Sequence, residues 1–324
     1  MNYIVFDLEW NQSPRGNAGS HPRMPFEIIE IGAVKLNDKL DIIDDFHTLI
    51  KPKIYPKFHK MIKEILSYSE EDLKNEGIPF KEACTNFLKW CGKKCGEDFV
   101  VCTWGPSDLY YLQSNMDFYY MEKLPYPVKF YNVQQIYADK YDHGSISKLE
   151  KAVASLGLED NEPFHTAISD ARYTAAVMKQ AKLGNFMDKY TFDIYRHPKR
   201  KDEEISEFHD GVLEEITMEY PSRIAAMAEP GVSTIRCVKC GRKLSKKINW
   251  FQALNSIEYG VGRCLIHGYM VSTIKIKKVG DSTDNIFLLK KTRPCQKSEL
   301  EDIKRKKITV QNKKKERELK LQKK

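Results

Sequence analysis

The sequence predicts an α/β fold in which a mixed β-sheet is flanked by helices, followed by a small, basic C-terminal domain. Strand-forming runs fill much of residues 1–50, and strand-like runs then alternate with helical patterns as far as residue 182. Strands followed by strand–helix alternation are typical of a mixed sheet with helices on both faces. Two spaced pairs of metal-ligand residues, at 237–240 and 264–267, mark the separate C-terminal domain.

The chain begins with an apolar run that is interrupted by two acids. Residues 3–6 are strong strand formers, and Asp7 and Glu9 follow them. Side chains at i and i+2 of a strand point to the same face, so both carboxylates are expected side by side near the end of a buried strand. A close carboxylate pair repels itself, and a divalent cation relieves that repulsion. The alternative is that the strand has ended and both acids are solvated.

The next hundred residues predict a loop, a β-meander and two helices. In order, these are a loop at 11–25, strands at 27–36 and 40–50, and helices at 58–66 and 79–92. Cys84 and Cys91 lie on the apolar stripe of the second helix, which predicts core positions for both. Cys95 and Cys102 are not spaced like a pair of metal ligands.

A third carboxylate follows the next predicted strand. Residues 99–104 form a continuous apolar run, as in a strand that is buried on both faces, and Gly105-Pro106 breaks it. Ser107 is expected to N-cap a helix that begins at Asp108. The carboxyl end of a strand in an α/β sheet is a favoured place for functional groups. Asp108 is therefore a candidate site residue, although an acid in a first helical turn also compensates the helix dipole.

The last part of the first domain supplies a histidine and a fourth acid. The expected elements are a strand at 128–131 and helices at 132–141, 147–156 and 164–182. His165 lies at or just before the start of the last helix, and Asp170 lies in its early turns.

Taken together, these residues resemble the DEDDh family of 3′–5′ exonucleases over about residues 1–182. The matching segments are FDLEW, EIIEIGAV, TWGPSD and HTAISDA. His165 stands five residues before Asp170, a spacing that separates this family from its tyrosine-bearing relatives. Within the family the chain is most similar to the RNA-directed enhancer-of-RNAi and 3′ histone-mRNA exonucleases, a group with bacterial KapD-like sporulation inhibitors. The resemblance implies a ribonuclease H-like fold with a five-stranded mixed sheet.

The resemblance also implies the roles of individual residues. Asp7, Glu9, Asp108 and Asp170 would hold two Mg²⁺ or Mn²⁺ ions, and oxygen ligands suit these cations. His165 would act as general base, and the products would be nucleoside 5′-monophosphates. The backbone groups after the first-strand acids, here those of Leu8 and Trp10, would border the terminal nucleotide. The Trp10 ring would stack on a base, or alternatively it would be buried beside the core strand. TWGPSD lacks the asparagine–aromatic–aspartate form of DNA-proofreading relatives, which favours the RNA-directed branch.

The C-terminal region predicts a structural zinc site. The segments CVKCG and CLIHG form two knuckles, C-x₂-C and C-x₂-H, separated by 23 residues. Cys237, Cys240, Cys264 and His267 are the expected ligands, with Cys295 as an alternative to His267. The glycine after each pair allows the turn that points backbone amides at the sulfurs. The predicted boundaries are an exonuclease domain at 1–183, a linker with some helix at 184–232, a zinc-ribbon-like domain at 233–295 and a basic tail at 296–324.

The charge distribution suggests a polyanionic partner for the second half. Residues 1–185 hold 22 Lys/Arg and 26 Asp/Glu, whereas the remainder holds 31 and 19. The basic groups gather around the first knuckle, with Trp250 and Phe251 nearby: Arg236, Lys239, Arg242, Lys243, Lys246 and Lys247. They predict nucleic-acid contact, and the alternative is a small structural domain whose zinc substitutes for a core. The tail, disordered or partly helical, would add weak affinity for phosphates.

The whole chain predicts a cytoplasmic, metal-dependent 3′–5′ exonuclease of single-stranded RNA. No run of about 18 apolar residues exists to cross a membrane, and no secretory signal precedes the first strand. The eight cysteines are then expected to be reduced or to bind metal. The rival hypotheses are the same chemistry on DNA, in repair or proofreading, and a non-catalytic RNA-binding adaptor.

Overall fold

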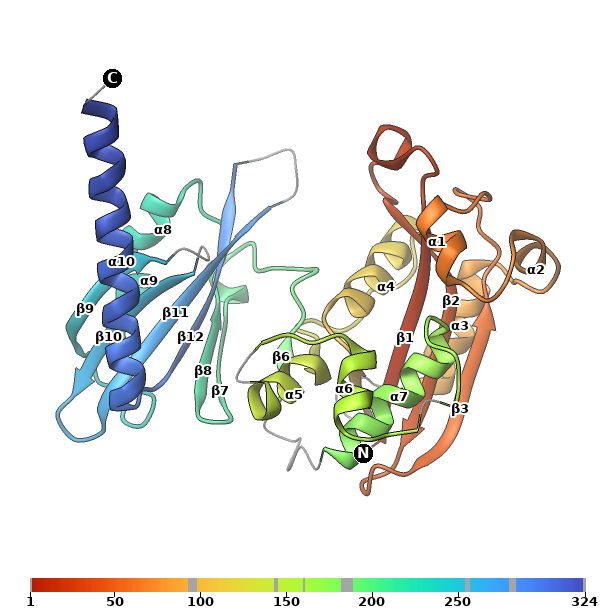
Figure 1. Cartoon of the computed structure of the whole chain (residues 1–324), viewed down its shortest axis with the longest axis horizontal. Helices are drawn as coiled ribbons and strands as arrows, with labels where there is room; N and C mark the ends of the chain where they lie inside the picture. The colour runs from red at the N-terminus through yellow and green to blue at the C-terminus, as the bar shows by residue number, and fades with distance from the viewer. Residues whose placement is uncertain are drawn as a thin grey trace. The chain divides into compact units, whose positions relative to one another are not determined.

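A computed structural model of the chain describes residues 2–92, 98–142, 145–159, 161–181, 189–253, 257–279 and 284–322. It divides into two compact units, which are Met1–Arg196, the first unit, and His197–Lys324, the second unit (Figure 1). Among the described residues, no helix is both long enough and apolar enough to span a bilayer.

The first unit is built on a six-stranded mixed sheet with the order β3-β2-β1-β4-β5-β6. Strands β1, β4 and β5 run parallel, and the other neighbours are antiparallel, which confirms the predicted mixed sheet. The strands are β1 (Asn2–Gln12), β2 (Phe26–Leu36), β3 (Ile42–Leu49), β4 (Phe99–Thr103), β5 (Lys129–Asn132) and β6 (Thr191–Phe192). The sixth strand, β6, is only two residues long and exceeds the five strands that were expected.

Strand β1 continues through both acids instead of ending near them. It pairs with β2 along almost its whole length, from Tyr3 to Gln12, so Asp7 and Glu9 are internal strand residues. The register shifts between Glu9 and Trp10. Such a bulge bends a strand and re-aims the side chains that follow it. The alternative, in which the strand has ended before two solvated acids, is therefore wrong.

Seven α-helices surround this sheet among the described residues. They are α1 (Lys60–Ile65), α2 (Glu70–Asn75), α3 (Phe80–Cys91), α4 (Ser107–Phe118), α5 (Val133–Tyr141), α6 (Leu149–Ser155) and α7 (Ala167–Gln180), with a short 3₁₀ turn at Gly16–Gly19. The sequence prediction missed α2. Ser107 is the first residue of α4 rather than its N-cap, which is Pro106 and forms no side-chain capping hydrogen bond.

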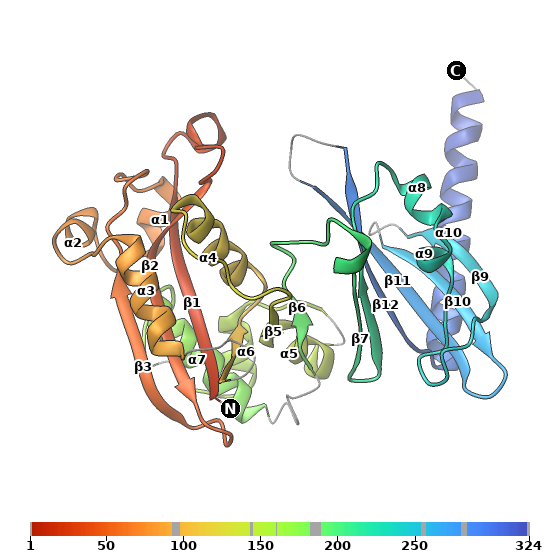
Figure 2. The ribbon, with the colours of Figure 1, turned by 180° about the vertical axis from the view of Figure 1, so that it is seen from behind.

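The helices form two layers, one on each face of the sheet (Figures 1 and 2). Ile4, Phe6 and Leu8 of β1 pack into a core with α3 and α4. Val5 packs into the opposite core with α5, α6 and α7. Because side chains alternate along a strand, Asp7 and Glu9 follow Val5 to the α7 side of the sheet. The predicted core positions of Cys84 and Cys91 are confirmed, and Cys95 lies outside the described residues.

The second unit is a six-stranded antiparallel sheet with the order β7-β8-β12-β11-β10-β9. Its strands are β7 (Ile205–His209), β8 (Val212–Ile216), β9 (Ser245–Gln252), β10 (Glu258–Cys264), β11 (Gly268–Lys278) and β12 (Ile286–Pro294). Its helices are α8 (Arg223–Ala228), α9 (Pro230–Ser233) and α10 (Lys297–Gln322), with a 3₁₀ turn at Lys201–Glu203.

This sheet corrects the predicted linker at 184–232 and the predicted tail at 296–324. β7 and β8 form a hairpin whose turn, Asp210-Gly211, has positive φ at both residues, and β8 pairs with β12 inside the sheet. At the other end, Leu300 and Ile303 of α10 are buried against the sheet. The predicted bounds 233–295 cover β9–β12 but omit these flanking elements of the same unit.

Candidate active site

The first two acids of the site lie beside a close contact between β2 and α7. Asp7 is paired in register with Gly32 of β2. A Cβ atom at Gly32 would lie 2.1 Å from the Ile168 nitrogen and 2.2 Å from the Ala167 carbonyl carbon. Only glycine therefore lets the backbone of α7 approach the sheet at this position. The first turns of α7, which carry Asp170, are brought to the face on which Asp7 and Glu9 lie.

Asp108 joins the site from the first turn of α4. Its side chain is 4% exposed, and its Oδ1 accepts a 3.2 Å hydrogen bond from the backbone N–H of Leu8. The strand-end position predicted for Asp108 thus brings it next to the segment between the first two acids. The side chain of Leu8 is buried in the core on the other face of the sheet.

Asp170 and His165 meet at the start of α7. The backbone N–H of His165 donates to Oδ2 of Asp170 at 3.3 Å, whereas Oδ1 of Asp170 is buried with no hydrogen-bond partner among the described residues. His165 has a φ of 65°, the left-handed region that few non-glycine residues occupy. Nε2 of its ring, 44% exposed, lies 3.7 Å from Oε1 of Glu150 in α6.

Contacts between Tyr173 of α7 and the preceding loop hold the segment that carries His165. The Tyr173 hydroxyl donates to the Glu162 carbonyl at 2.6 Å and accepts from the Glu162 N–H at 2.9 Å. Phe164 stacks on the Tyr173 ring with a centroid separation of 4.5 Å. The strained backbone of His165 is therefore fixed from the preceding segment as well as by Asp170.

Burial and mutual repulsion raise the pKa of all four acids. Desolvation, followed by the nearby Asp108 carboxylate, raises the pKa of Asp7 well above its usual value. Desolvation and then Glu30 do the same to the pKa of Glu9. Burial raises the pKa of Asp108 to about 7, although the Leu8 amide opposes the shift, and raises the pKa of Asp170 to about 7. A cluster of four acids that disfavour ionisation calls for a compensating positive charge.

The donor set fits a divalent metal ion. A carboxylate oxygen of Glu9, a carboxylate oxygen of Asp170 and a ring nitrogen of His165 all lie within 4.8 Å of one another. Asp7 and Asp108 belong to the same cluster, because, besides burial, the negative charge of Asp170 raises the pKa of both. Oδ1 of Asp170, which has no hydrogen-bond partner in the described part of the chain, is the kind of buried acceptor that a metal ion satisfies. The carboxylate oxygens match the preference of Mg²⁺ and Mn²⁺.

The sequence analysis missed a fifth carboxylate, Glu30. It is 1% exposed on β2 and stands opposite Glu9 in the strand register. Its Oε1 lies 2.8 Å from Nε2 of His47, and its Oε2 accepts a 3.0 Å bond from the Tyr68 hydroxyl. Because both of its oxygens already have partners, Glu30 is not expected to be a metal ligand, and its carboxylate adds to the negative charge beside Glu9. The signal in the sequence was an acid inside the apolar strand run EIIEIGAV.

Trp10 lies half-buried in an aromatic group at the edge of the α3/α4 core. Its ring centroid is 4.8 Å from that of Tyr111 and 6.4 Å from that of Phe26. The predicted contacts of Leu8 and Trp10 with a terminal nucleotide stay predictions.

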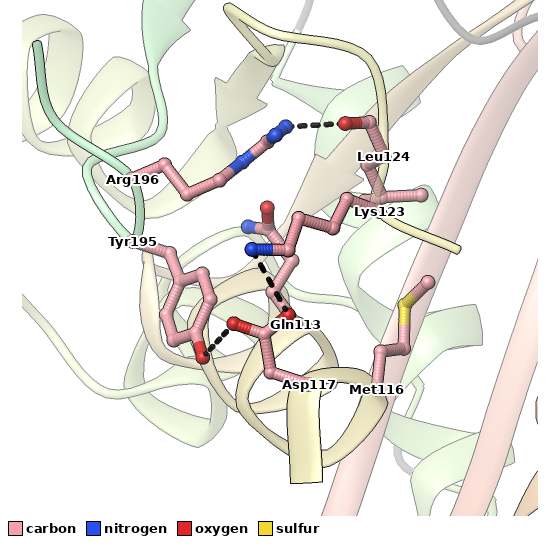
Figure 3. Close-up of a pocket in the computed structure, with 7 residues that line it drawn as sticks. All are labelled: Gln113, Met116, Asp117, Lys123, Leu124, Tyr195 and Arg196. Atoms are coloured by element: carbon pink, nitrogen blue, oxygen red, sulfur yellow. Dashed lines mark hydrogen bonds and ion pairs between the residues drawn. The ribbon is translucent and has the colours of Figure 1, made fainter. Parts of the chain in front are cut away.

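A small pocket elsewhere in the first unit contains none of the predicted site residues (Figure 3). The Tyr195 hydroxyl donates to Oδ2 of Asp117 at 2.9 Å, and Lys123 pairs with the other oxygen of Asp117 at 3.7 Å. Arg196 donates to the Leu124 carbonyl across the same space. These contacts tie the end of the first unit to α4, which is a structural role.

The second unit brings together the four predicted zinc ligands. Sγ of Cys237 lies 3.4 Å from Nδ1 of His267, Sγ of Cys264 lies 3.7 Å from the same nitrogen, and the sulfurs of Cys240 and Cys264 are 3.9 Å apart. Backbone N–H groups of His267 and Ile266 lower the pKa of Cys264 to about 6. Gly241 and Gly268 have φ values of 69° and 79°, as the knuckle turns require.

Cys295 is not part of this cluster. It packs with Tyr269 and Leu300 in the core between the sheet and α10. The alternative of Cys295 as a ligand in place of His267 is therefore wrong.

Comparison with known proteins gives the family. Residues 4–178, more than half of the chain, match the family model described as Exonuclease, RNase T. The chain is 26% identical over 170 residues to the Bacillus subtilis (strain 168) protein named "Probable 3′-5′ exonuclease KapD". The aligned region covers 52% of this chain and 78% of that protein.

Two solved structures resemble part of the chain. One is the nuclease domain of 3′hExo, a DEDDh family member, bound to rAMP, with 19% identity, a TM-score of 0.47, and coverage of 59% of this chain and 95% of that chain. The other is a 3′-exonuclease with histone mRNA stem-loop recognition, with 18% identity, a TM-score of 0.47, and coverage of 66% and 89%. By its family match, the chain belongs to the exonuclease family and is a DEDDh-type 3′–5′ exonuclease, a hydrolase.

Proposed function

We propose that the chain removes nucleotides from the 3′ end of single-stranded RNA and releases nucleoside 5′-monophosphates. Asp7, Glu9, Asp108 and Asp170 would hold two Mg²⁺ or Mn²⁺ ions. The observation that carries this proposal is the buried carboxylate cluster, in which Oδ1 of Asp170 has no partner among the described residues and Oδ2 accepts from the His165 backbone N–H. When bound, the ions would stabilise charge on the attacking and leaving oxygens of a phosphodiester displacement.

The arrangement of His165 supports its role as general base. Its ring is partly exposed, so a water molecule can reach a ring nitrogen, whereas its backbone is fixed by Asp170. An unprotonated ring nitrogen can take a proton from that water. Oε1 of Glu150 lies 3.7 Å from Nε2 of His165 and would help to orient the ring.

One feature supports RNA over DNA as the substrate. The TWGPSD segment departs from the proofreading pattern, whereas the excess of basic residues in the second unit suits either nucleic acid. The same carboxylate site would act equally on DNA, so the preference depends on groups outside the metal cluster.

We also propose that the second unit holds one structural Zn²⁺. Zn–S and Zn–N bonds of about 2.3 Å and about 2.0 Å in a tetrahedron separate the ligand atoms by about 3.5–3.8 Å. The separations between the sulfurs and the His267 nitrogen, 3.4 Å and 3.7 Å, match this value. Such an ion would stabilise the turn that precedes β9 against the β10–β11 turn.

The test is a time course on 5′-labelled single-stranded RNA and on DNA of the same sequence, with Mg²⁺, with Mn²⁺ or without either. We expect a metal-dependent ladder that shortens from the 3′ end of RNA, with DNA cleaved more slowly. Asp7→Ala should abolish the ladder and still bind the RNA. Equal or faster cleavage of DNA would replace the RNA proposal with a DNA one. RNA binding without cleavage of either strand would favour an adaptor, and wild-type turnover by Asp7→Ala would refute the site.

A further inference from the structure

The second unit is strongly basic, but its aromatic side chains do not form the RNA platform expected from the sequence. Residues 230–324 contain 25 Lys/Arg and 8 Asp/Glu. The Trp250 indole N–H donates to the Ser233 carbonyl at 2.9 Å, and the ring packs against the buried cores of the unit. Phe251 stacks on Tyr259 and is approached by Lys307 of α10. Both rings are therefore used in folding, and the basic surface has to be sought elsewhere.

The strand register gathers three lysines on one face of the sheet. Lys275 and Lys277 are two residues apart on β11, so their side chains share a face. Lys291 of β12 is paired with Thr273, which lies on that same face. We call Lys275, Lys277 and Lys291 the lysine face.

The described helices of the second unit do not cover this part of the sheet, although His197 stacks on Phe287, the strand partner of Lys277. The buried contacts of α10 are with Ile248, Val261 and Val271, at the β9, β10 and early β11 side (Figure 1). Helices α8 and α9 cover the opposite face, where they pack against Ile274 and Leu288 (Figures 1 and 2). The lysine face therefore lies beyond the α10 contact, at the later part of β11.

The charges of the lysine face are only partly compensated. Lys291 lies 3.2 Å from Oε1 of Glu214, a buried acid that also contacts His209 at 3.0 Å. Lys275 and Lys277 form no ion pair with any residue in the described part of the chain. Burial, followed by repulsion from Lys291 and Lys277, lowers the pKa of Lys275. Like charges on neighbouring strand positions destabilise a sheet, and a bound anion would remove that repulsion.

We propose that the lysine face binds the phosphate backbone of the RNA substrate, away from the 3′ end that the active site holds. This inference rests on the RNA substrate proposed above. A polyanion fits better than a protein surface, because the exposed charged groups of this face are ammonium groups. Backbone contacts of this kind add affinity for long substrates in a sequence-independent and salt-dependent way. The chemical step at the carboxylate site is unaffected.

The test compares two double substitutions of exposed lysines on different strands. Lys275→Gln with Lys277→Gln removes two charges of the lysine face, and Lys291 is kept because it neutralises buried Glu214. Lys246→Gln with Lys247→Gln removes two charges from β9, near the first knuckle, and is the matched control. Each pair is placed in the full chain with Asp7→Asn, so that RNA of about 20 nucleotides is bound in Mg²⁺ without being degraded.

We expect the β11 pair to weaken RNA binding about 5- to 20-fold and the β9 pair to change it less than about twofold. The plot of log affinity against log salt concentration has a negative slope. For the Lys275→Gln, Lys277→Gln variant this slope should become less steep by about 1.4, since each lost single-strand phosphate contact removes about 0.7. In the active protein, the β11 pair should raise KM for the long RNA and leave hydrolysis of a dinucleotide unchanged, because a dinucleotide has no phosphate to spare for the lysine face.

The outcomes separate this inference from the proposed function. If the wild type degrades RNA and the β11 pair binds it as tightly as the control, the lysine face is overturned while the proposed function stands. A larger loss of RNA affinity in the Lys246→Gln, Lys247→Gln variant would place RNA binding near the first knuckle, and it would also overturn the lysine-face proposal. If the wild type fails to degrade RNA, the proposed function is lost, and the binding comparison still decides whether the lysine face contacts RNA.

Discussion

The backbone N–H of Leu8 donates a 3.2 Å hydrogen bond to Oδ1 of Asp108, a residue 100 positions later in the chain. The bond joins the strand segment between Asp7 and Glu9 directly to the first turn of α4. Asp108 is therefore oriented by the protein itself, before any metal ion binds. A carboxylate that is held in place in this way loses little freedom when it becomes a ligand.

Asp108→Asn separates the charge of this residue from its hydrogen bond. The amide oxygen can still accept the Leu8 N–H, but the negative charge is gone, so we expect RNA hydrolysis to fall by about 100-fold or more. Without Mg²⁺, the melting temperature should be unchanged or higher, because a buried neutral group is less costly than a buried charge. Asp108→Ala, which also loses the bond, should melt lower than Asp108→Asn. Near-normal turnover by Asp108→Asn would exclude Asp108 as a ligand.

The raised acid pKa values predict how stability depends on pH without the catalytic metal. Burial raises the pKa of Asp108 and of Asp170 to about 7 in the folded protein, above the value of about 3.9 in an unfolded chain. The folded state thus binds protons that the unfolded state has released, so this stabilisation is complete below about pH 4 and is lost as the pH rises through about 7. In Mg²⁺-free buffer, the melting temperature of the wild type should fall more across this range than that of Asp108→Asn. Parallel melting curves would contradict the raised pKa of Asp108.

Gly32 is predicted to control both stability and the position of the fourth acid. In Gly32→Ala, the new methyl group would meet the backbone of Ala167 and Ile168, which cannot turn away as a side chain can. Overpacking of this kind costs about 1–3 kcal/mol, and it would move the start of α7 away from β2. We expect a lower melting temperature together with weaker Mg²⁺ activation, measured as the Mg²⁺ concentration for half-maximal hydrolysis. Gly157→Ala, at a positive φ with open space around it, is the matched control for backbone strain alone. Equal effects of the two substitutions on Mg²⁺ activation would contradict the role of Gly32.

The sequence predicted the parts of the active site that depend on local pattern. The two-residue period of a strand put Asp7 and Glu9 on one face, and the strand–helix junction marked Asp108. Only the family resemblance connected His165 and Asp170 with them. Glu30 could not be placed in this way, because its position beside Glu9 depends on the register between β1 and β2. The close approach allowed by Gly32 depends likewise on how α7 packs.

In the second unit, the sequence contained a hairpin turn signal that its acidic composition led us to overlook. Residues 205–216 contain two short runs of mixed apolar and polar residues on either side of Asp210-Gly211, a dipeptide typical of tight hairpins. Their many acids suggested a linker, whereas β8 uses Glu214 and Glu215 to pair with Lys291 and Lys290 of β12. That pairing is a tertiary relationship between distant segments, and it is what makes a charged stretch part of a sheet.

The zinc site can be tested through its exposed ligand. Cys240 is exposed, so Cys240→Ser removes a sulfur ligand with little loss of packing, and any large effect reports on the metal. We expect zinc measured by atomic absorption to fall from about one per chain to near zero, and the second unit to unfold at a lower temperature, because the binding energy of a structural zinc is folding energy. Cys295→Ser is the matched control. Cys295 lies outside the ligand cluster, so this variant should retain about one zinc per chain. Full zinc retention by Cys240→Ser would remove this residue from the ligand set, and zinc-free wild-type protein of normal stability would refute the site altogether.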